Sequence, residues 1–281
     1  DRVIEVAGEA MRHALETSLV SGTVARSPLN EAFLARGTVI QGLGRAVDFG
    51  LSAVEGASQV ARGGPNAVSF IVAVEPGGLA QLPEIWHVEK IVAGPASRGA
   101  IDLDDRIADN LRRIAFARDV LVQDLTVAML DRPRHQDLVA EVAATGARIL
   151  ALEEGDFAGA VMAAMQGTGV DAAIGIADLQ ATLMAACAVR CLGGELQARL
   201  WPRNDEERAL VGDQASRIYG LADLAPAADI SIAITGVTGG QLLPGVMFNS
   251  GYAETSSLLM SSRHAVVRRM STRHHVVGDP S

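Results

Sequence analysis

Two arginines flank a proline at the end of an apolar segment. The segment LTVAMLD (125–131) is typical of a buried strand, and Arg132, Pro133 and Arg134 follow it. A guanidinium group carries a planar fork of donors that matches phosphate or carboxylate oxygens, so this spacing indicates an anion site. Surface arginines that merely cap a sheet leave the same pattern, and the sequence alone does not separate the two interpretations.

A second polar cluster, Glu154-Gly155-Asp156, stands between a strand pattern and a helix pattern. Its carboxylates can accept hydrogen bonds from ligand hydroxyls. They also suit the first turn of a helix, where the helix dipole favours negative charge, so helix formation alone explains them. Further along, TGVTGG (235–240) has the glycine content of a loop whose backbone amides bind an anion, although such turns are common after strands.

Histidine is the usual acid–base residue near neutral pH. His87 lies within a strand pattern beside Trp86, where a structural role is the more common one. The stretch RRMSTRHH (268–275) ends on two histidines, but no acidic residues or ligand spacing accompany them. We therefore interpret 268–275 as a solvated tail.

The elements that must position these residues alternate along the second half of the chain. This alternation of helix and strand patterns predicts a parallel sheet with crossover helices. Ligands of such sheets bind at the carboxyl ends of the strands. Those ends carry DRPRH (131–135), EEGD (153–156), GIAD (175–178) and TGVTGG. The expected helices are 105–120, 135–147, 157–165 and 179–194, and the expected strands are 125–131, 148–156, 170–178 and 230–237.

The first half is less regular. A helix is expected over 3–19, and residues 22–48 are expected to be irregular. A buried strand at 66–75 and a second, facing strand at 85–94 follow. Two lobes should meet near residues 95–105, an N-terminal α+β lobe (1–100) and a C-terminal α/β lobe (101–281). The polar stretch 202–220 should form an exposed helix or an insertion.

Composition narrows the functional class. The 281 residues are 49% hydrophobic and 4% aromatic, so a core of aliphatic side chains is possible. A formal net charge of −9 argues against a nucleic-acid binder. No apolar run is long enough for a membrane span, and the first residues do not form a signal peptide, so we expect a soluble, cytoplasmic protein. The sequence contains no G-x-S-x-G, H-E-x-x-H, P-loop or G-x-G-x-x-G motif.

Many segments, in order, resemble the class II fructose-1,6-bisphosphatases. The resemblance runs from about residue 3 to residue 273 and includes GPNAVSFIVAV, HVEKIVAGP, LTVAMLDRPRHQDLVAEVAATGARI, EEGDFAGAVMAAM, RCLGGELQARLWPRNDEER and ITGVTGGQLLPGV. It implies an α/β, layered sugar-phosphatase fold, shared with inositol monophosphatases, with two sheets and crossover helices. It also implies hydrolysis of the 1-phosphate assisted by Mn²⁺ or Mg²⁺, and a homo-oligomer. Members of the family begin with one more helix, which the printed sequence lacks.

The departures from the family fall on its catalytic carboxylates. The family's metal motif D-P-I-E-G-T becomes SAVEGA (52–57), in which only Glu55 and Gly56 remain. Asn30 stands where the family has its catalytic aspartate, and Ile4 and Ala181 stand at positions of metal ligands. Hard divalent cations need several carboxylate oxygens, and one glutamate cannot hold two of them. The sequence therefore predicts no metal, no cofactor and no metal-dependent phosphate ester hydrolysis.

The other half of the family's site is kept. Arg132 and Arg134 match the motif that contacts phosphate, and Glu154, Gly155 and Asp156 match the motif that contacts the sugar. Lys90 is also retained, whereas His87 replaces the family's tyrosine. The expected partner is a small, anionic or phosphorylated molecule, with no nucleic acid and no membrane.

Three functions remain open. The first is an enzyme that runs metal-independent chemistry in the old cleft, with His87, Glu55 and Asp178 as acid–base candidates. The second is a non-catalytic protein that senses a sugar phosphate or regulates an active paralogue. The third is a weak fructose-1,6-bisphosphatase with a rebuilt metal site, in which other acids would replace the lost ligands.

Overall fold

A computed structural model of the chain describes residues 2–28, 30–42 and 44–275. The chain forms two compact units, one made of Asp1–Pro76 with Asp229–Ser281 and the other of Gly77–Ala228. The expected boundary between residues 100 and 101 does not coincide with these units. The physical reason is that β11 (Ile230–Gly236) pairs with β4 (Val68–Val74), which returns the end of the chain to the first sheet.

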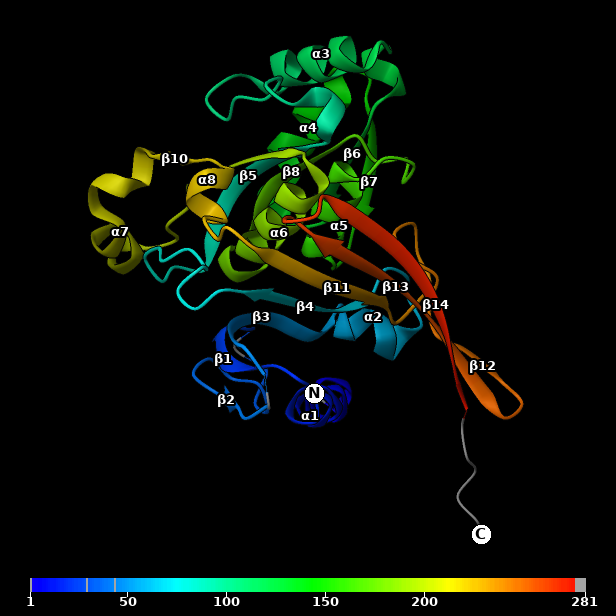
Figure 1. Cartoon of the computed structure of the whole chain (residues 1–281). Helices are drawn as coiled ribbons and strands as arrows, with labels where there is room; N and C mark the ends of the chain where they lie inside the picture. The colour runs from blue at the N-terminus through cyan, green and yellow to red at the C-terminus, as the bar shows by residue number, and fades with distance from the viewer. Residues whose placement is uncertain (1, 29, 43, 276–281) are drawn as a thin grey trace. The chain divides into compact units, whose positions relative to one another are not determined.

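The first unit is built on an eight-stranded sheet (Figure 1). Its strand order is β12-β13-β11-β4-β3-β1-β2, and β14 pairs along β13. Only β1 and β3 run parallel; the other pairs are antiparallel. The remaining elements of this unit are α1 (Arg2–Glu16), β1 (Ser21–Arg26), β2 (Val39–Ile40), β3 (Ala46–Glu55), α2 (Ala57–Arg62), β12 (Met247–Asn249), β13 (Tyr252–Ser261) and β14 (Val266–His275).

The helix α1 confirms the helix expected over 3–19 and covers one end of this sheet. Leu15 of α1 packs with Val24, Phe49 and Leu51 of the sheet. The expectation that residues 22–48 are irregular is confirmed for 30–38 but wrong where β1, β2 and the start of β3 lie. These strands are short or begin with exposed residues, so they leave little apolar alternation in the sequence.

The interpretation of 268–275 as a tail is also wrong. These residues belong to β14, which pairs with β13 over its whole length, from Val266 with Ser261 to His275 with Tyr252. Most side chains of β14 are exposed on both faces of the sheet. A strand without a buried face shows no alternation of apolar and polar residues, so periodicity does not reveal β14. No strand among the described residues pairs with the outer edge of β14.

The second unit contains a six-stranded sheet in the order β10-β9-β5-β8-β6-β7 (Figure 1). The strands β6, β7 and β8 run parallel, as their alternation with helices predicts. However, β5 lies between β8 and β9 and runs antiparallel to both, and β10 is antiparallel to β9. The sheet is therefore mixed rather than parallel. Its strands are β5 (His87–Ala93), β6 (Thr126–Leu130), β7 (Arg148–Leu152), β8 (Ala172–Asp178), β9 (Glu195–Leu200) and β10 (Ile218–Tyr219).

Helices cover both faces of this sheet. On one face, α3 and α4 pack Leu111, Ile114 and Val142 onto Ile91 and Val127. On the other face lie α5 and α6, and every residue of α5 after its first is buried. The two sheets with interleaved helices confirm the predicted α/β fold class. The helices are α3 (Ile107–Arg118), α4 (Gln136–Ala144), α5 (Asp156–Ala164), α6 (Leu179–Leu192), α7 (Asp205–Val211) and α8 (Leu221–Leu224), with 3₁₀ turns at Pro95–Ser97, Val122–Asp124, Pro133–His135 and Gly212–Ser216.

Two further comparisons with the sequence concern β5 and α7. The strand patterns at 66–75 and 85–94 correspond to β4 and β5, which belong to different sheets. The stretch 202–220 contains α7, as expected, although Glu207 and Val211 of this helix are buried. In the part of the chain that the structure describes, no helix combines the length and the apolar character needed to cross a membrane.

Candidate functional site

One end of the six-stranded sheet gathers most of the predicted site residues. The carboxyl ends of β6, β7 and β8 meet there because these strands run parallel. Since β5 runs the opposite way, its first residue, His87, lies beside Asp178, the last residue of β8. The loops 131–135 and 153–156 follow β6 and β7 at the same end. The sequence placed three of its four expected strand-end segments together correctly, whereas the prediction for the fourth, TGVTGG, is wrong because β11 joins the sheet of the first unit.

His135 fixes the loop after β6 to the neighbouring strand. Its ring is buried, with Nδ1 at 2.7 Å from the carbonyl oxygen of Leu130. The backbone N–H of Ile176 donates to Nε2 at 2.8 Å, so Nε2 is the acceptor and Nδ1 carries the proton. Gly175 makes room for the ring, because a Cβ at that position would lie 3.1 Å from His135 and the backbone φ is +144°. Sequence reasoning did not single out this histidine.

Arg132 and Arg134 project from the loop that His135 holds. Arg134 donates from Nε and Nη2 to the carbonyl oxygen of Ile176 at 3.3 and 3.0 Å. Arg132 donates from Nη1 to the carbonyl oxygen of Asp131 at 2.8 Å. Neither guanidinium forms an ion pair with a carboxylate of the described residues. Loss of hydration, with the positive charge of Arg132 beside it, lowers the pKa of Arg134.

Lys90 and Asp156 form a buried ion pair behind this loop. The Lys90 side chain is 2% exposed and donates from Nζ to a carboxylate oxygen of Asp156, the first residue of α5. Gly155 precedes it with φ +92°, a conformation that favours glycine, and Glu154 is half-buried. Lys90 was predicted to bind substrate, but its charge is balanced within the protein. In the structure, Lys90 therefore contacts and orients the carboxylate of Asp156.

The three acid–base candidates are not equivalent. Asp178 is the N-cap of α6 and accepts a hydrogen bond from the backbone N–H of Ala181 at 2.8 Å. Loss of hydration, with Asp156 nearby, raises the pKa of Asp178. His87 lies beside Asp178, and burial lowers the pKa of its ring, with Arg134 and Arg203 adding to the shift. Glu55 ends β3 in the first unit, so it does not share the sheet of the other two.

The glycine-rich loop TGVTGG belongs to the first unit and has little free backbone to offer an anion. Its Val237 and Thr238 amides donate to the carbonyl oxygen of Ala67 at 2.9 and 3.2 Å. The amide of Gly240 donates to Leu243 at 3.0 Å. An anion nest needs unused N–H groups that converge, so these bonds argue against the anion-binding interpretation.

The positions where the family resemblance implies metal ligands do not form a donor set for divalent cations. Ile4 is a buried apolar residue of α1, Ser52 is buried in β3, and Ala181 lies in the first turn of α6. Asn30 is exposed. Among the residues that the structure describes, no three His, Cys, Asp or Glu side chains form a group that could hold a metal ion. Hard cations such as Mg²⁺ and Mn²⁺ need several oxygens at once, so these residues do not fit them.

One carboxylate near these positions is deeply buried. Glu31 is 2% exposed, and one of its oxygens accepts from the backbone N–H of Ala53 at 2.7 Å and from the Ser52 hydroxyl at 3.4 Å. Its other oxygen, Oε2, is buried without a hydrogen-bond partner. Burial raises the pKa of Glu31, and the hydrogen bonds to the carboxylate only partly oppose the shift.

The stability of the fold should therefore fall as pH rises through the range in which Glu31 titrates. The folded chain keeps the proton to a higher pH than the unfolded chain, so it binds more protons between the two pKa values. The free energy of unfolding lost through one titrating group is at most about 1.4 kcal/mol per pH unit. The variant Glu31→Gln does not titrate, so its stability relative to wild type should increase from about pH 4 upward. Urea unfolding of both proteins across this pH range measures the difference in their free energies of unfolding. A difference that stays constant with pH would contradict the prediction.

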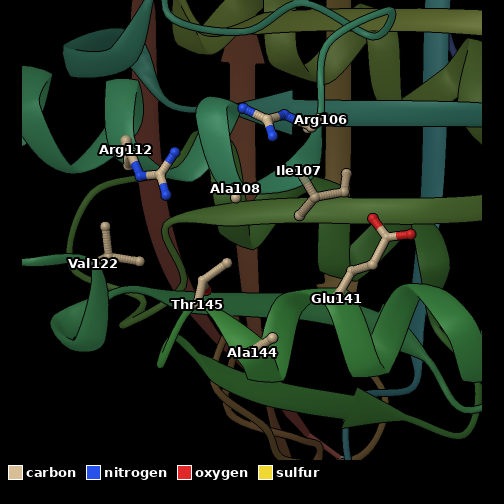
Figure 2. A pocket seen from close by; sticks show the side chains of 8 residues that line it. All are labelled: Arg106, Ile107, Ala108, Arg112, Val122, Glu141, Ala144 and Thr145. Atoms are coloured by element: carbon tan, nitrogen blue, oxygen red, sulfur yellow. The ribbon is translucent and has the colours of Figure 1, made fainter.

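A groove of ≈490 Å³ also lies between α3 and α4. Figure 2 shows Arg106 and Arg112 on the α3 side, with Glu141 of α4 across from Arg106. A cavity of ≈290 Å³ shares Arg106 and Glu141 with this groove and extends to Arg134. Arg106 and Arg112 share Asp109 as their ion-pair partner, and Glu141 also lines the groove, so both positive charges have carboxylates beside them. The groove is accordingly a poorer anion site than the loop after β6.

Comparison with known proteins places these features in a family context. The family model for bacterial, glpX-encoded fructose-1,6-bisphosphatase matches residues 1–274. The chain is 31% identical to fructose-1,6-bisphosphatase 1 class 2 of Escherichia coli (strain K12), over 95% of this chain and 85% of that protein. The class 2 fructose-1,6-bisphosphatases of Escherichia coli O6:H1 and Shigella flexneri match with the same identity and coverage.

Proposed function

Because this chain belongs to the family of bacterial, glpX-encoded fructose-1,6-bisphosphatases, we propose that it binds a phosphorylated small molecule at the end of β6, β7 and β8 without metal-dependent hydrolysis. The observation that carries the proposal is the pair of guanidinium groups of Arg132 and Arg134, which have no carboxylate partner among the described residues. Two like charges on one loop repel each other, and a bound anion removes that repulsion.

The contrast with other arginines supports this proposal. Arginine and carboxylate side chains pair throughout the described part of the chain, on helices, on strands and in loops. Ion pairing is not general, since the exposed Arg45 and Arg98 form no ion pair among the described residues, and Arg132 and Arg134 differ from these two in lying together on one loop at the strand ends. The ion-paired arginines are Arg12, Arg106, Arg112, Arg113, Arg118, Arg199, Arg203, Arg208, Arg217 and Arg263.

The segment Glu154-Gly155-Asp156 supports a ligand with hydroxyl groups, such as a sugar phosphate. Lys90 orients the Asp156 carboxylate, and Glu154 remains partly open to solvent. Carboxylate oxygens accept hydrogen bonds from hydroxyls. The same two motifs contact phosphate and sugar in the family that the sequence resembles.

The geometry supports binding of a ligand better than it supports catalysis by a repurposed enzyme. Of the three acid–base candidates, Asp178 caps a helix and Glu55 belongs to the other unit. The remaining candidate, His87, has a buried ring nitrogen, Nδ1, without a hydrogen-bond partner. A single histidine without a positioned nucleophile or second acid is a weak basis for catalysis. We therefore infer that the chain senses or carries its ligand, and that turnover of the ligand is not its main activity.

Calorimetric titration in the presence of a chelator tests the proposal. Wild type should bind fructose 1,6-bisphosphate or another sugar phosphate, and Arg134→Ala should bind about tenfold more weakly or worse, since it loses a charge-assisted contact. Arg112→Ala serves as the control, because it removes an arginine of the same unit that already pairs with Asp109. Failure of wild type to bind any phosphorylated ligand, or equal binding by Arg134→Ala, would contradict the proposal.

A further inference from the structure

The chain has only two tryptophans, and both lie beside the proposed anion site. Trp86 precedes β5 directly, and Trp201 follows β9, the strand that pairs with β5. Their side chains are 46% and 36% exposed. Large aromatic rings usually bury their faces, so two exposed rings at the same end of two paired strands indicate a surface kept for a partner.

Glu207 of α7 holds the two tryptophan segments together. Its carboxylate accepts from the backbone N–H of Arg203 at 2.8 Å and from the Arg203 guanidinium at 2.7 and 3.0 Å. The backbone N–H of Trp86 donates to the same carboxylate. The guanidinium of Arg203 also lies 5.1 Å from the centre of the Trp86 ring. One buried carboxylate thus fixes both segments before any ligand arrives.

His87 connects these rings to the arginine loop. Its ring meets Trp201 edge-on, with 6.0 Å between the ring centres and 89° between the planes. Burial lowers the pKa of the His87 ring, and the charge of Arg134 adds to this shift. Its Nδ1 is buried without a hydrogen-bond partner. A buried nitrogen of this kind loses hydration without compensation, and a ligand atom can restore it.

The polar surroundings favour a flat aromatic ring over a sugar at this place. Arg203 and Glu207, the charged groups that would bind sugar hydroxyls, are occupied with each other. The backbone N–H of Trp201 already donates to the carbonyl oxygen of His87 at 2.9 Å, and the carbonyl oxygen of Trp86 already accepts from the backbone N–H of Leu179 at 3.0 Å. Each sugar hydroxyl that loses water needs a new partner, whereas an aromatic ring needs only a flat apolar face.

We propose that Trp86, His87 and Trp201 form a ring-binding subsite, and that the ligand is a phosphate ester that carries an aromatic or heteroaromatic ring in addition to its hydroxyl groups. Its phosphate lies on Arg132 and Arg134, and its ring lies against the tryptophans with one polar atom toward His87. This inference rests on the proposed function for the phosphate, but it adds a separate requirement for the ring.

Titration with two phosphate monoesters tests the inference. The probes are phenyl phosphate and glucose 1-phosphate, which carry the same charged group and differ in the ring. Phenyl phosphate should bind about tenfold more tightly, as expected for one stacked ring. It should also quench tryptophan fluorescence, and both tryptophans of the chain belong to the subsite. Trp201→Leu and Trp86→Leu should each reduce the preference without weakening glucose 1-phosphate.

The controls separate the two proposals. Arg134→Ala should weaken the binding of both esters. Phe248 of the first unit is 81% exposed, and Phe248→Leu should leave the binding of both esters unchanged. If wild type binds both esters with equal affinity, the ring subsite is refuted and the phosphate site stands. If wild type binds neither ester, the proposed function fails and the ring subsite fails with it. A preference for phenyl phosphate that survives in both tryptophan variants also refutes the subsite.

Discussion

Purified protein supplied with Mn²⁺ or Mg²⁺ is expected to release phosphate from fructose 1,6-bisphosphate no faster than the buffer does. The positions where the family resemblance implies metal ligands carry Ile4, Ser52 and Ala181, and the resemblance places Asn30 where the family has its catalytic acid. Without bound cations, nothing activates the attacking water or neutralises the leaving phosphate. The loss of one positioned electrostatic group costs about a hundredfold in rate, and here several are absent together.

The assay compares this protein with fructose-1,6-bisphosphatase 1 class 2 of Escherichia coli at equal concentration, with and without chelator. The relative serves as the positive control. Thermal melting with and without chelator gives a second readout, because a protein that binds a metal in its folded state is stabilised by it. Phosphate release abolished by chelator, together with a lower melting temperature, would instead identify a weak phosphatase with a rebuilt metal site.

Removal of the Asp156 carboxylate, the partner of the buried Lys90, is expected to destabilise the fold strongly. In Asp156→Ala, the ammonium of Lys90 would remain in a site where its side chain is only 2% exposed. Breaking a buried ion pair from one side typically costs about 3–5 kcal/mol, since the remaining charge is neither hydrated nor paired. Urea denaturation of wild type and variant at neutral pH measures the difference directly.

Two controls identify burial of the charge as the cause. Asp205→Ala removes the partner of Arg208 from an exposed pair, and it should change the free energy of unfolding by about 0.5 kcal/mol or less. The double variant Lys90→Met/Asp156→Ala removes both charges and should recover much of the lost stability. A loss below about 1 kcal/mol in Asp156→Ala would mean that Lys90 finds water or another partner.

Local sequence patterns predicted the part of the fold that positions the site. The strands β6, β7 and β8 are short apolar runs followed by helix patterns, and this alternation determines their direction. The direction of β5 could not be predicted in this way. The chain enters β5 from the first unit, and no helix links β5 to a parallel neighbour. Its antiparallel direction is what brings His87 to the end of the sheet where β6, β7 and β8 finish.

The site was predictable in its residue types and less so in their roles. Arg132, Arg134 and Asp156 lie together as the strand ends suggested. That Lys90 is neutralised by Asp156 depends on which face of β5 it occupies, and that follows from the register. His135 was missed because both its hydrogen bonds go to backbone atoms, of Leu130 and Ile176, which leave no trace in the sequence.

The outer edge of β14 has a consequence for the solubility of the chain. This edge is ten residues long and pairs with no strand of the described residues, so it presents backbone groups to which another molecule could add a strand, the first step of aggregation. Arg268, Arg269 and Arg273 lie along this strand, so two copies that approached edge to edge would bring like charges together. Salt screens such repulsion. The protein is therefore best protected against aggregation through this edge in dilute salt, and less so as ionic strength rises.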